Sequence, residues 1–371
     1  MSDDLQEKLA DFDAELTLNR ARTIPGAWYT DPEIYAAECR RVFHDTWQVA
    51  GRVDQVAEPG SFFTAELAGE PIVVVRDESG TLRAFYNVCR HRAAQVAPEP
   101  AGKTTRFRCR YHGWTYDLAG RLRGTPEFEG VADFDRAQNG LVPVSVDTWG
   151  PLVWVHLGGP HETLADFLSP LPERTAGRGV ETLHFVERRD YTLRCNWKVF
   201  VDNYLDGGYH VNTVHPGLAD VLDYSRYRTE TAAHTSVQIS PIRGSSPGGA
   251  AGVGAVRGGD AAYYWWVFPN FMLNLYEGIM DTNLVLPLGV DSCRVIFDFY
   301  FAKTGSQAAQ PFMEQSISVA HQIQQEDVDI CEEVQRGLAS RAYGAGRFSV
   351  KREEGVYHFQ RLLAQRLRGT R

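Results

Sequence analysis

The sequence lacks any apolar run of the roughly 18–20 residues that a membrane-spanning helix needs. It also has no run of basic residues, and its 38 lysines and arginines are outnumbered by 47 acidic side chains, which leaves a formal net charge of −9. A net negative charge and the absence of a basic run are not typical of a protein that binds nucleic acid. Residues 1–16 are acidic and do not resemble a secretory signal. We therefore expect a cytoplasmic protein that associates with neither membrane nor nucleic acid.

Cysteine is scarce, with six residues in a chain of 371. In a long cytoplasmic protein this number does not indicate a disulfide framework. Four cysteines stand alone among apolar or mixed neighbours and are typical core residues: Cys39, Cys195, Cys293 and Cys331. The other two, Cys89 and Cys109, differ because a histidine follows each of them two or three residues later.

The overall composition is that of a folded protein. Hydrophobic residues make up 43% of the chain and charged residues 23%, and the length suffices for two domains or one large one. Residues 1–45 are polar and predict helices, with a helix start near Asp31. Over residues 46–157, short strand-like runs alternate with turn dipeptides such as Ser79-Gly80, which predicts a small antiparallel β domain.

The remaining residues, 158–371, have a mixed pattern. Residues 158–190 predict loops and short helices, and a helical segment follows over 196–220. Strand-like runs such as YYWWVF, FMLNLY and CRVIFDFYF then lead to predicted helices over 311–336 and 356–368. Residues 245–260 are rich in glycine, alanine and serine and predict a mobile loop, which is either a lid or only an exposed connection at the surface.

Two short pairs of metal-ligand residues stand in the predicted β domain: Cys89-x-His91 and Cys109-x-x-His112. Each pair lies at the end of a predicted strand, where a loop can direct both side chains toward one metal centre. One interpretation is a tetrahedral structural zinc, although zinc sites commonly pair cysteine with cysteine and histidine with histidine. The other is a two-iron, two-sulfide cluster in which two histidines replace two cysteines on one iron, which raises its reduction potential. The mixed pairs favour the cluster.

A second group of candidate ligands lies in the helical segment after residue 196. Asp202, Asp206, His210 and His215 occur within it, and two histidines with one carboxylate form the facial triad that leaves coordination positions of iron(II) open for O₂. His210 and His215 are roughly 140° apart on a regular helix, so a bulge or a break near Pro216 is required. The third ligand is then a carboxylate of the helix over 311–336, where five acidic residues compete: Glu326, Asp327, Asp329, Glu332 and Glu333.

These residues make the chain resemble the catalytic α subunit of a Rieske non-haem iron oxygenase, from about Trp28 to Leu363. The stretches DNYLDGGYHV, FPNFMLNLY, MDTNLVLPL and DVDICEEVQRGL are most similar to choline monooxygenase-like members. The family pattern places the cluster on four residues: Cys89, His91, Cys109 and His112. It places the catalytic iron on three residues: His210, His215 and Asp327.

The resemblance also implies an acidic residue that relays electrons from the cluster to the iron. The family has it three positions before the first iron histidine, where this chain has Gly207. We assign the bridge to Asp206, because it is the nearest carboxylate and the following glycines let the backbone adjust; Asp202 is the next candidate. Asn203 matches a position beside the iron.

The implied fold is α+β. A small antiparallel β Rieske domain (residues 46–157) is inserted in a larger domain (residues 1–45 and 158–371), where helices cover an antiparallel sheet in a helix-grip arrangement. Members of this family usually form rings of three subunits, in which each cluster serves the iron of a neighbour. Electrons come from NAD(P)H through a separate reductase, with or without a ferredoxin, because this chain has no dinucleotide-binding fingerprint.

The substrate is open at this point. A choline-like quaternary ammonium compound would be held by aromatic faces, for which Tyr204, Tyr209 and the run from Tyr263 to Trp266 are candidates, although such a run is also typical of sheet packing. The reaction would be hydroxylation or N-demethylation. The alternatives are aromatic ring hydroxylation or aryl ether O-demethylation, and, in another class, a non-catalytic Rieske electron carrier.

Overall fold

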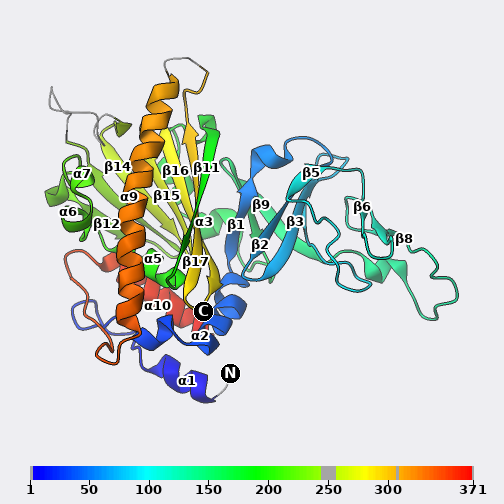
Figure 1. Cartoon of the computed structure of the whole chain (residues 1–371), viewed down its shortest axis with the longest axis horizontal. Coiled ribbons are helices and arrows are strands. Elements are labelled where there is room, and N and C mark those ends of the chain that lie inside the picture. The colour runs from blue at the N-terminus through cyan, green and yellow to red at the C-terminus, as the bar shows by residue number, and fades with distance from the viewer. Residues whose placement is uncertain (1–2, 244–255, 306–308, 370–371) are drawn as a thin grey trace. The chain divides into compact units, whose positions relative to one another are not determined.

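The computed structural model describes residues 3–243, 256–305 and 309–369. The first part of the loop predicted over 245–260 lies outside these residues. Two compact units make up the chain, Phe43–Asp166 and the combination of Met1–Val42 with Phe167–Arg371 (Figure 1). Within the described residues, no helix combines the length and apolar character needed to cross a lipid bilayer.

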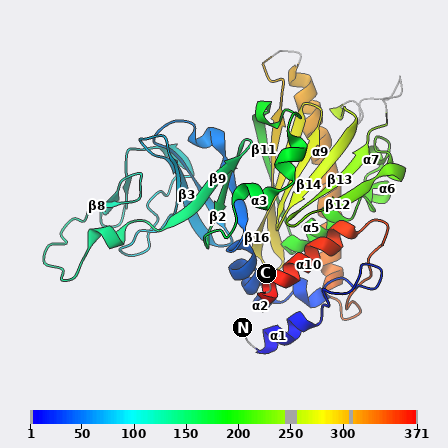
Figure 2. The same cartoon turned by 180° about the vertical axis from the view of Figure 1, so that it is seen from behind.

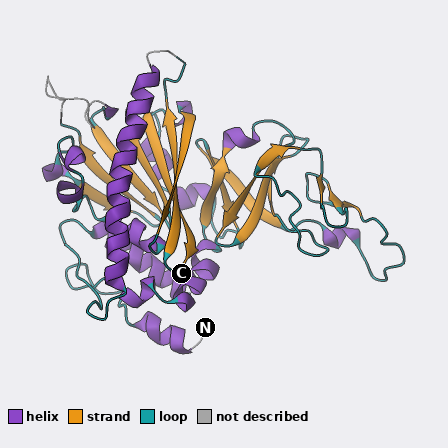
Figure 3. Cartoon of the chain, viewed as in Figure 1, coloured by secondary structure: helices purple, strands orange, loops and turns teal. Residues whose placement is uncertain are grey.

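The unit Phe43–Asp166 is built from antiparallel strands (Figure 3). Seven of them pair in the order β1-β10-β9-β4-β3-β2-β5, and three short ones pair as β6-β7-β8. Its strands are β1 (Trp47–Arg52), β2 (Ser61–Leu67), β3 (Glu70–Arg76), β4 (Leu82–Tyr86), β5 (Ala101–Lys103), β6 (Phe107–Arg108), β7 (Thr115–Tyr116), β8 (Leu122–Gly124), β9 (Pro143–Trp149) and β10 (Leu152–His156).

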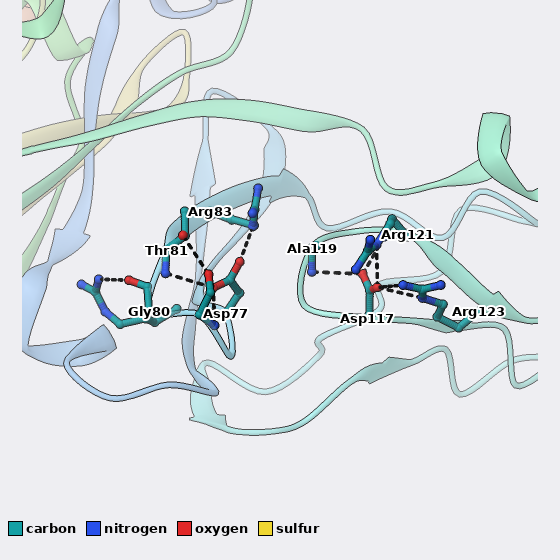
Figure 4. A network of polar contacts seen from close by, with 10 residues as sticks. Asp77, Gly80, Thr81, Arg83, Asp117, Ala119, Arg121 and Arg123 are labelled. Carbon is teal, nitrogen blue, oxygen red and sulfur yellow. Dashed lines mark hydrogen bonds and ion pairs between the residues drawn. The ribbon is translucent and has the colours of Figure 1, made fainter.

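Two turns of this unit have the same arrangement of hydrogen bonds and the same sequence pattern, D-x-x-G-x-L-R (Figure 4). In the β3–β4 turn, Asp77 Oδ1 accepts hydrogen bonds from the backbone N–H groups of Ser79 and Thr81, and Asp77 Oδ2 accepts one from Arg83. Asp117 makes the equivalent bonds between β7 and β8. Although burial opposes its ionisation, a hydrogen bond from the Ser79 hydroxyl together with these bonds lowers the pKa of Asp77 to about 2. One turn leads into the strand before Cys89, and the other follows the strand after His112.

The other unit is organised on a seven-stranded antiparallel sheet in the order β11-β17-β16-β15-β14-β13-β12. These strands are β11 (His184–Leu193), β12 (Arg228–Thr231), β13 (Thr235–Pro241), β14 (Ala261–Val267), β15 (Phe271–Tyr276), β16 (Ile279–Gly289) and β17 (Ser292–Phe301). The prediction of loops and short helices over 158–190 is wrong from His184 onward. Polar residues run through the middle of β11, an edge strand, so its sequence lacks the apolar alternation by which strands are found.

The longest described helix, α9, lies across one face of this sheet in both opposite views (Figures 1 and 2). The helices are α1 (Asp3–Ala10), α2 (Pro32–Glu38), α3 (Leu164–Leu168), α4 (Leu171–Thr175), α5 (Trp197–Leu205), α6 (Val211–Val214), α7 (Pro216–Ala219), α9 (Ala309–Leu338) and α10 (Glu354–Arg368). The predicted helices over 311–336 and 356–368 are confirmed as α9 and α10.

Helix α5 is fixed by buried polar contacts at its start. The Asn196 side chain caps it by accepting a hydrogen bond from the backbone N–H of Lys198 at 3.1 Å. The Lys198 ammonium is fully buried and bonds the Glu38 carboxylate of α2 at 2.6 Å. Removing either partner would leave an uncompensated charge in the core. This pair therefore holds the helix that carries Asn203 and leads to Asp206.

Candidate metal centres

The two cysteine–histidine pairs lie on two loops with the same backbone geometry. The N–H of Cys89 donates to the carbonyl of Ala94 at 2.8 Å, and the N–H of Cys109 donates to that of Trp114 at 2.8 Å. The fourth residue after each cysteine bonds back to the cysteine carbonyl and has a positive φ, which Gly113 adopts freely and Ala93 adopts under strain. Both loops therefore hold their cysteines rigidly.

These loops carry the four predicted cluster ligands, which are two thiols and two imidazoles. Both thiols are only 3% exposed, whereas His112 is exposed at the surface. The Nδ1 atoms of His91 and His112 lie 3.1 Å apart. With metal–nitrogen bonds of about 2.1 Å, two ligands of one tetrahedral metal lie roughly 3.4 Å apart. Both imidazoles can therefore bind the same iron through Nδ1.

The described residues contain one group in which three candidate ligand atoms all lie within 4.8 Å: His210, His215 and Asp327. The first site has a different donor set, two buried thiols and two imidazoles. This set fits a cluster in which the cysteines hold one iron and the histidines hold the other. The residues present thus fit a [2Fe–2S] group.

A double-glycine turn directs the chain into the second site. Helix α5 ends with Leu205, and Gly207 and Gly208 follow Asp206 with φ values of +68° and +70°. A Cβ atom on Gly207 would lie 2.0 Å from the carbonyl oxygen of Arg352, and one on Gly208 would lie 2.9 Å from the Tyr227 ring. Only glycine allows both this backbone and this close packing.

The predicted break before Pro216 is also present. Helix α6 ends at Val214, His215 has φ −119° and ψ +72°, and α7 begins at Pro216. As a result, His210 and His215 flank a single helical turn, and their ring centroids lie 4.9 Å apart. The Nε2 atoms of His215 and His210 lie 3.1 Å and 3.8 Å from Asp327 Oδ1.

Each histidine also uses its other nitrogen. His210 Nδ1 lies 2.5 Å from Asp206 Oδ2, and His215 Nδ1 lies 2.6 Å from Glu326 Oε2. Such carboxylates fix the ring orientation and the tautomer of a metal-binding histidine, leaving Nε2 free for the metal. Asn203 donates a hydrogen bond to Asp327 Oδ1 at 2.7 Å. The donor set of two imidazoles and one carboxylate fits mononuclear iron(II).

Glu326 was predicted only as one of five candidates for the third iron ligand, and its contact with His215, 111 residues away in the sequence, was not predicted. Asp202, the second candidate for the bridge, lies elsewhere. Its carboxylate accepts hydrogen bonds from Tyr29 at 2.5 Å and Gln360 at 3.1 Å, and burial raises its pKa to about 7. It does not line the cavity described next.

A cavity of about 110 Å³ opens on the His210–His215–Asp327 group. Four tyrosines from different elements line it: Tyr204, Tyr227, Tyr264 and Tyr276. The Tyr227 and Tyr264 rings are nearly parallel, with centroids 6.4 Å apart, and Tyr276 stands at 84° to Tyr264. Burial holds the pKa of Tyr204, Tyr227 and Tyr264 well above the ordinary value, so these phenols are neutral.

The aromatic residues singled out in the sequence divide between this cavity and other places. Tyr204 and Tyr264 line it. Tyr209 is 55% exposed and does not, and Tyr263, on the opposite face of β14, accepts a hydrogen bond from Arg178. Trp265 and Trp266 are buried in the core, as the packing interpretation predicted. Tyr227 and Tyr276 were not predicted.

Comparison with known protein families identifies both parts of the chain. Residues 46–135 match the Rieske [2Fe-2S] domain, and residues 180–369 match the ring hydroxylating alpha subunit (catalytic domain). The chain therefore belongs to the Rieske non-haem iron oxygenases as a catalytic α subunit. Its cofactors are a Rieske [2Fe–2S] cluster and a mononuclear non-haem iron. Because the chain includes the catalytic domain of this family, it is not a non-catalytic Rieske electron carrier.

Curated relatives include a chloroplastic choline monooxygenase of Arabidopsis thaliana, 42% identical over 98% of this chain and 87% of the relative. The carnitine monooxygenase oxygenase subunit of Escherichia coli (strain K12) is 31% identical over 93% and 94% of the two chains. A crystal structure of the quaternary ammonium Rieske monooxygenase CntA superposes with a TM-score of 0.84 at 28% identity, covering 94% and 96% of the chains. Naphthalene 1,2-dioxygenase, at 16% identity and a TM-score of 0.78, shares the fold.

Proposed function

We propose that this chain is the oxygenase component of a system that hydroxylates a small quaternary ammonium compound, with choline as the leading substrate. The observation that carries the proposal is the tyrosine-lined cavity beside His210, His215 and Asp327. A quaternary ammonium ion has no N–H group to donate and is bound through its attraction to aromatic faces, at about 0.5–2 kcal/mol for each ring. The relatives named for choline and carnitine support the same class.

The size of the cavity favours a small substrate. Its volume of about 110 Å³ is smaller than the apolar cavity of about 150 Å³ that holds a benzene molecule. The lining also includes Asp281, whose carboxylate accepts a hydrogen bond from Asn274 at 2.6 Å. Neutral phenols and a carboxylate suit a trimethylammonium cation better than an uncharged aromatic hydrocarbon or aryl ether.

Each residue has a separate task in this proposal. His210, His215 and Asp327 would hold the iron, which would supply open coordination positions for O₂. Asp206 and Glu326 orient the two imidazoles, and Asn203 fixes the Asp327 carboxylate. Cys89, His91, Cys109 and His112 hold the cluster. Residues 46–157 would form the electron-transfer domain, and residues 1–45 with 158–371 the catalytic domain.

We further propose a homotrimer in which Asp206 relays electrons from the cluster of a neighbouring subunit to the mononuclear iron site of its own subunit. The exposure of His112 supports a protein contact at that histidine, and a similar solved structure, of a quaternary ammonium Rieske monooxygenase, is described in terms of inter-subunit electron transfer. The electrons would come from NAD(P)H through a separate reductase, with or without a ferredoxin. Residues 90–123 carry eight arginines and lysines against two acids, which suits an acidic donor protein.

The test of the proposed function is the aerobic turnover of choline by the protein with both metal centres loaded and a reductase supplied. We expect consumption of O₂ coupled to formation of betaine aldehyde hydrate, detected by mass spectrometry. Naphthalene and anisole serve as comparison substrates for the ring-hydroxylating and O-demethylating alternatives. Turnover of either of these, without turnover of choline or a related trimethylammonium compound, would contradict the proposal.

Replacing Tyr264 with leucine should raise the KM for choline by roughly 2–30-fold, because one aromatic face is lost from the cavity. Steady-state kinetics on the variant measures this effect. Tyr263→Leu is the matched control, since it makes the same change at the neighbouring residue on the opposite face of the same strand. Equal effects of the two substitutions would show that Tyr264 acts only in packing.

A further inference from the structure

One buried polar side chain of the cavity has no partner in the part of the chain that the structure describes. Gln324 is 1% exposed and lines the cavity from α9, and neither its Nε2 nor its Oε1 atom makes a hydrogen bond to a described residue. Leaving a buried amide unpaired costs about 1–3 kcal/mol for each group. A residue kept in this state beside a substrate cavity indicates a ligand that completes its hydrogen bonds.

A second side-chain amide of the cavity lining also has an unpaired group. Ala320 and Ile323 of the same helix also line the cavity, and neither has a side-chain group that can pair with the amide. On β16, Asn283 is 2% exposed and lines the same cavity, and its Nδ2 atom likewise has no partner among the described residues. Among the described residues, the lining therefore holds one unpaired acceptor, Gln324 Oε1, and two unpaired donors, Gln324 Nε2 and Asn283 Nδ2.

The other polar groups of the lining are already engaged. Arg257 donates a hydrogen bond to Ser316 Oγ at 2.5 Å and lies 3.9 Å from Asp281 Oδ1, and its guanidinium covers the Tyr276 ring at 4.9 Å. The Tyr204 hydroxyl donates to Asn274 at 2.7 Å. The unsatisfied hydrogen-bonding capacity of the cavity is therefore concentrated on the two amides.

We propose that Gln324 binds the hydroxyl group of an amino-alcohol substrate, with the Asn283 amide as an additional donor. This inference rests on the proposed function and specifies which end of the substrate each part of the cavity binds. A hydroxyl group both donates and accepts, so it satisfies Oε1 and Nε2 of one amide together, whereas a carboxylate can only accept. The tyrosines then take the trimethylammonium group.

The position of Gln324 on α9 gives this contact a function in the reaction. Gln324 and Asp327 are three residues apart and share one face of the helix. A hydroxyl bound at Gln324 is therefore held about one helical turn from the carboxylate that we assign to the iron. This arrangement would present the carbon that bears the hydroxyl to the metal, and it makes Gln324 a residue that determines specificity.

The experiment compares choline with ethyltrimethylammonium, in which a hydrogen replaces the hydroxyl group. Dissociation constants are measured by isothermal titration calorimetry on the anaerobic, iron-loaded protein, so no turnover is needed. Wild-type protein should bind choline about tenfold more tightly than the analogue. In Gln324→Leu the two constants should come within about twofold of each other through the loss of choline affinity.

The matched control is Gln325→Leu, which makes the same change at an exposed neighbour and should keep the wild-type preference. Iron content is determined for each variant. Equal affinity of wild-type protein for the two ligands, an unchanged preference in Gln324→Leu, or equal weakening of both ligands would overturn the hydroxyl contact while the substrate class stands. If neither ligand binds wild-type protein, the quaternary ammonium class is itself wrong and the contact falls with it.

Discussion

Replacing His210 with alanine should abolish hydroxylation while leaving the visible spectrum of the iron–sulfur cluster unchanged. The substitution removes one of three ligand atoms that lie within 4.8 Å of one another. Loss of a residue that only supports a metal ligand typically costs 10–100-fold in affinity or activity, so loss of the ligand itself should reduce turnover by roughly 100-fold or more. Turnover, iron content and the absorption spectrum of the purified variant measure the three parts of this prediction.

The control for this variant is His184→Ala, which removes an exposed histidine of the same unit. It should keep both turnover and iron content. The cluster residues are carried by a different unit from His210, so the spectrum of His210→Ala should match that of the wild-type protein. Substantial turnover by His210→Ala, or a bleached cluster, would contradict the assignment of two separate centres.

The second large effect is expected at Asp206. In Asp206→Asn, both metals should remain bound, but single-turnover reoxidation of the reduced cluster in the presence of substrate and O₂ should slow by roughly 10–100-fold. The Asp206 carboxylate lies 2.5 Å from His210 Nδ1 and also accepts hydrogen bonds from the backbone N–H groups of Tyr209 and His210. The asparagine keeps the shape but loses the charge that stabilises this arrangement.

Stopped-flow absorbance at the cluster band measures this rate directly. Asp220→Asn is the control, because it removes the charge of an exposed aspartate at the end of α7. It should leave the rate within about twofold of wild type, as expected for surface charges. A wild-type rate in Asp206→Asn would refute the bridge at this position, and the burial of Asp202 against Tyr29 leaves that residue a poor substitute.

Most of the metal ligands could be predicted from the sequence because they occur in short local pairs. Cys89 with His91, Cys109 with His112, and His210 with His215 are separated by five residues or fewer, although the last pair can face one metal only with the break before Pro216. Asp327 depended on the family resemblance, although a physical signal was available. The buried residues of α9 recur every three or four positions, and Asp327 continues the series of Met313, Ala320, Gln324 and Cys331.

The substrate side of the cavity could not be predicted in the same way. Tyr276 meets Tyr264 because β15 pairs with β14 in a register that sets Asn274 opposite Tyr264 and places Tyr276 diagonally on the same face. Tyr227 reaches Tyr264 from a different part of the chain. In the sequence, Glu326 and Gln324 both resemble ordinary polar helix residues. The fold shows that Glu326 bonds a histidine, whereas Gln324 is buried with no partner among the described residues.

The most direct test of this account is the metal and sulfide content of the purified protein. One chain that holds both a Rieske cluster and a mononuclear iron should contain about three iron atoms and about two acid-labile sulfides. Chelation under mild reducing conditions should remove the single iron first and leave the sulfide in place. Zinc in place of iron without sulfide, or two irons with two sulfides and no iron recovered by the His210 site after reconstitution, would contradict the account.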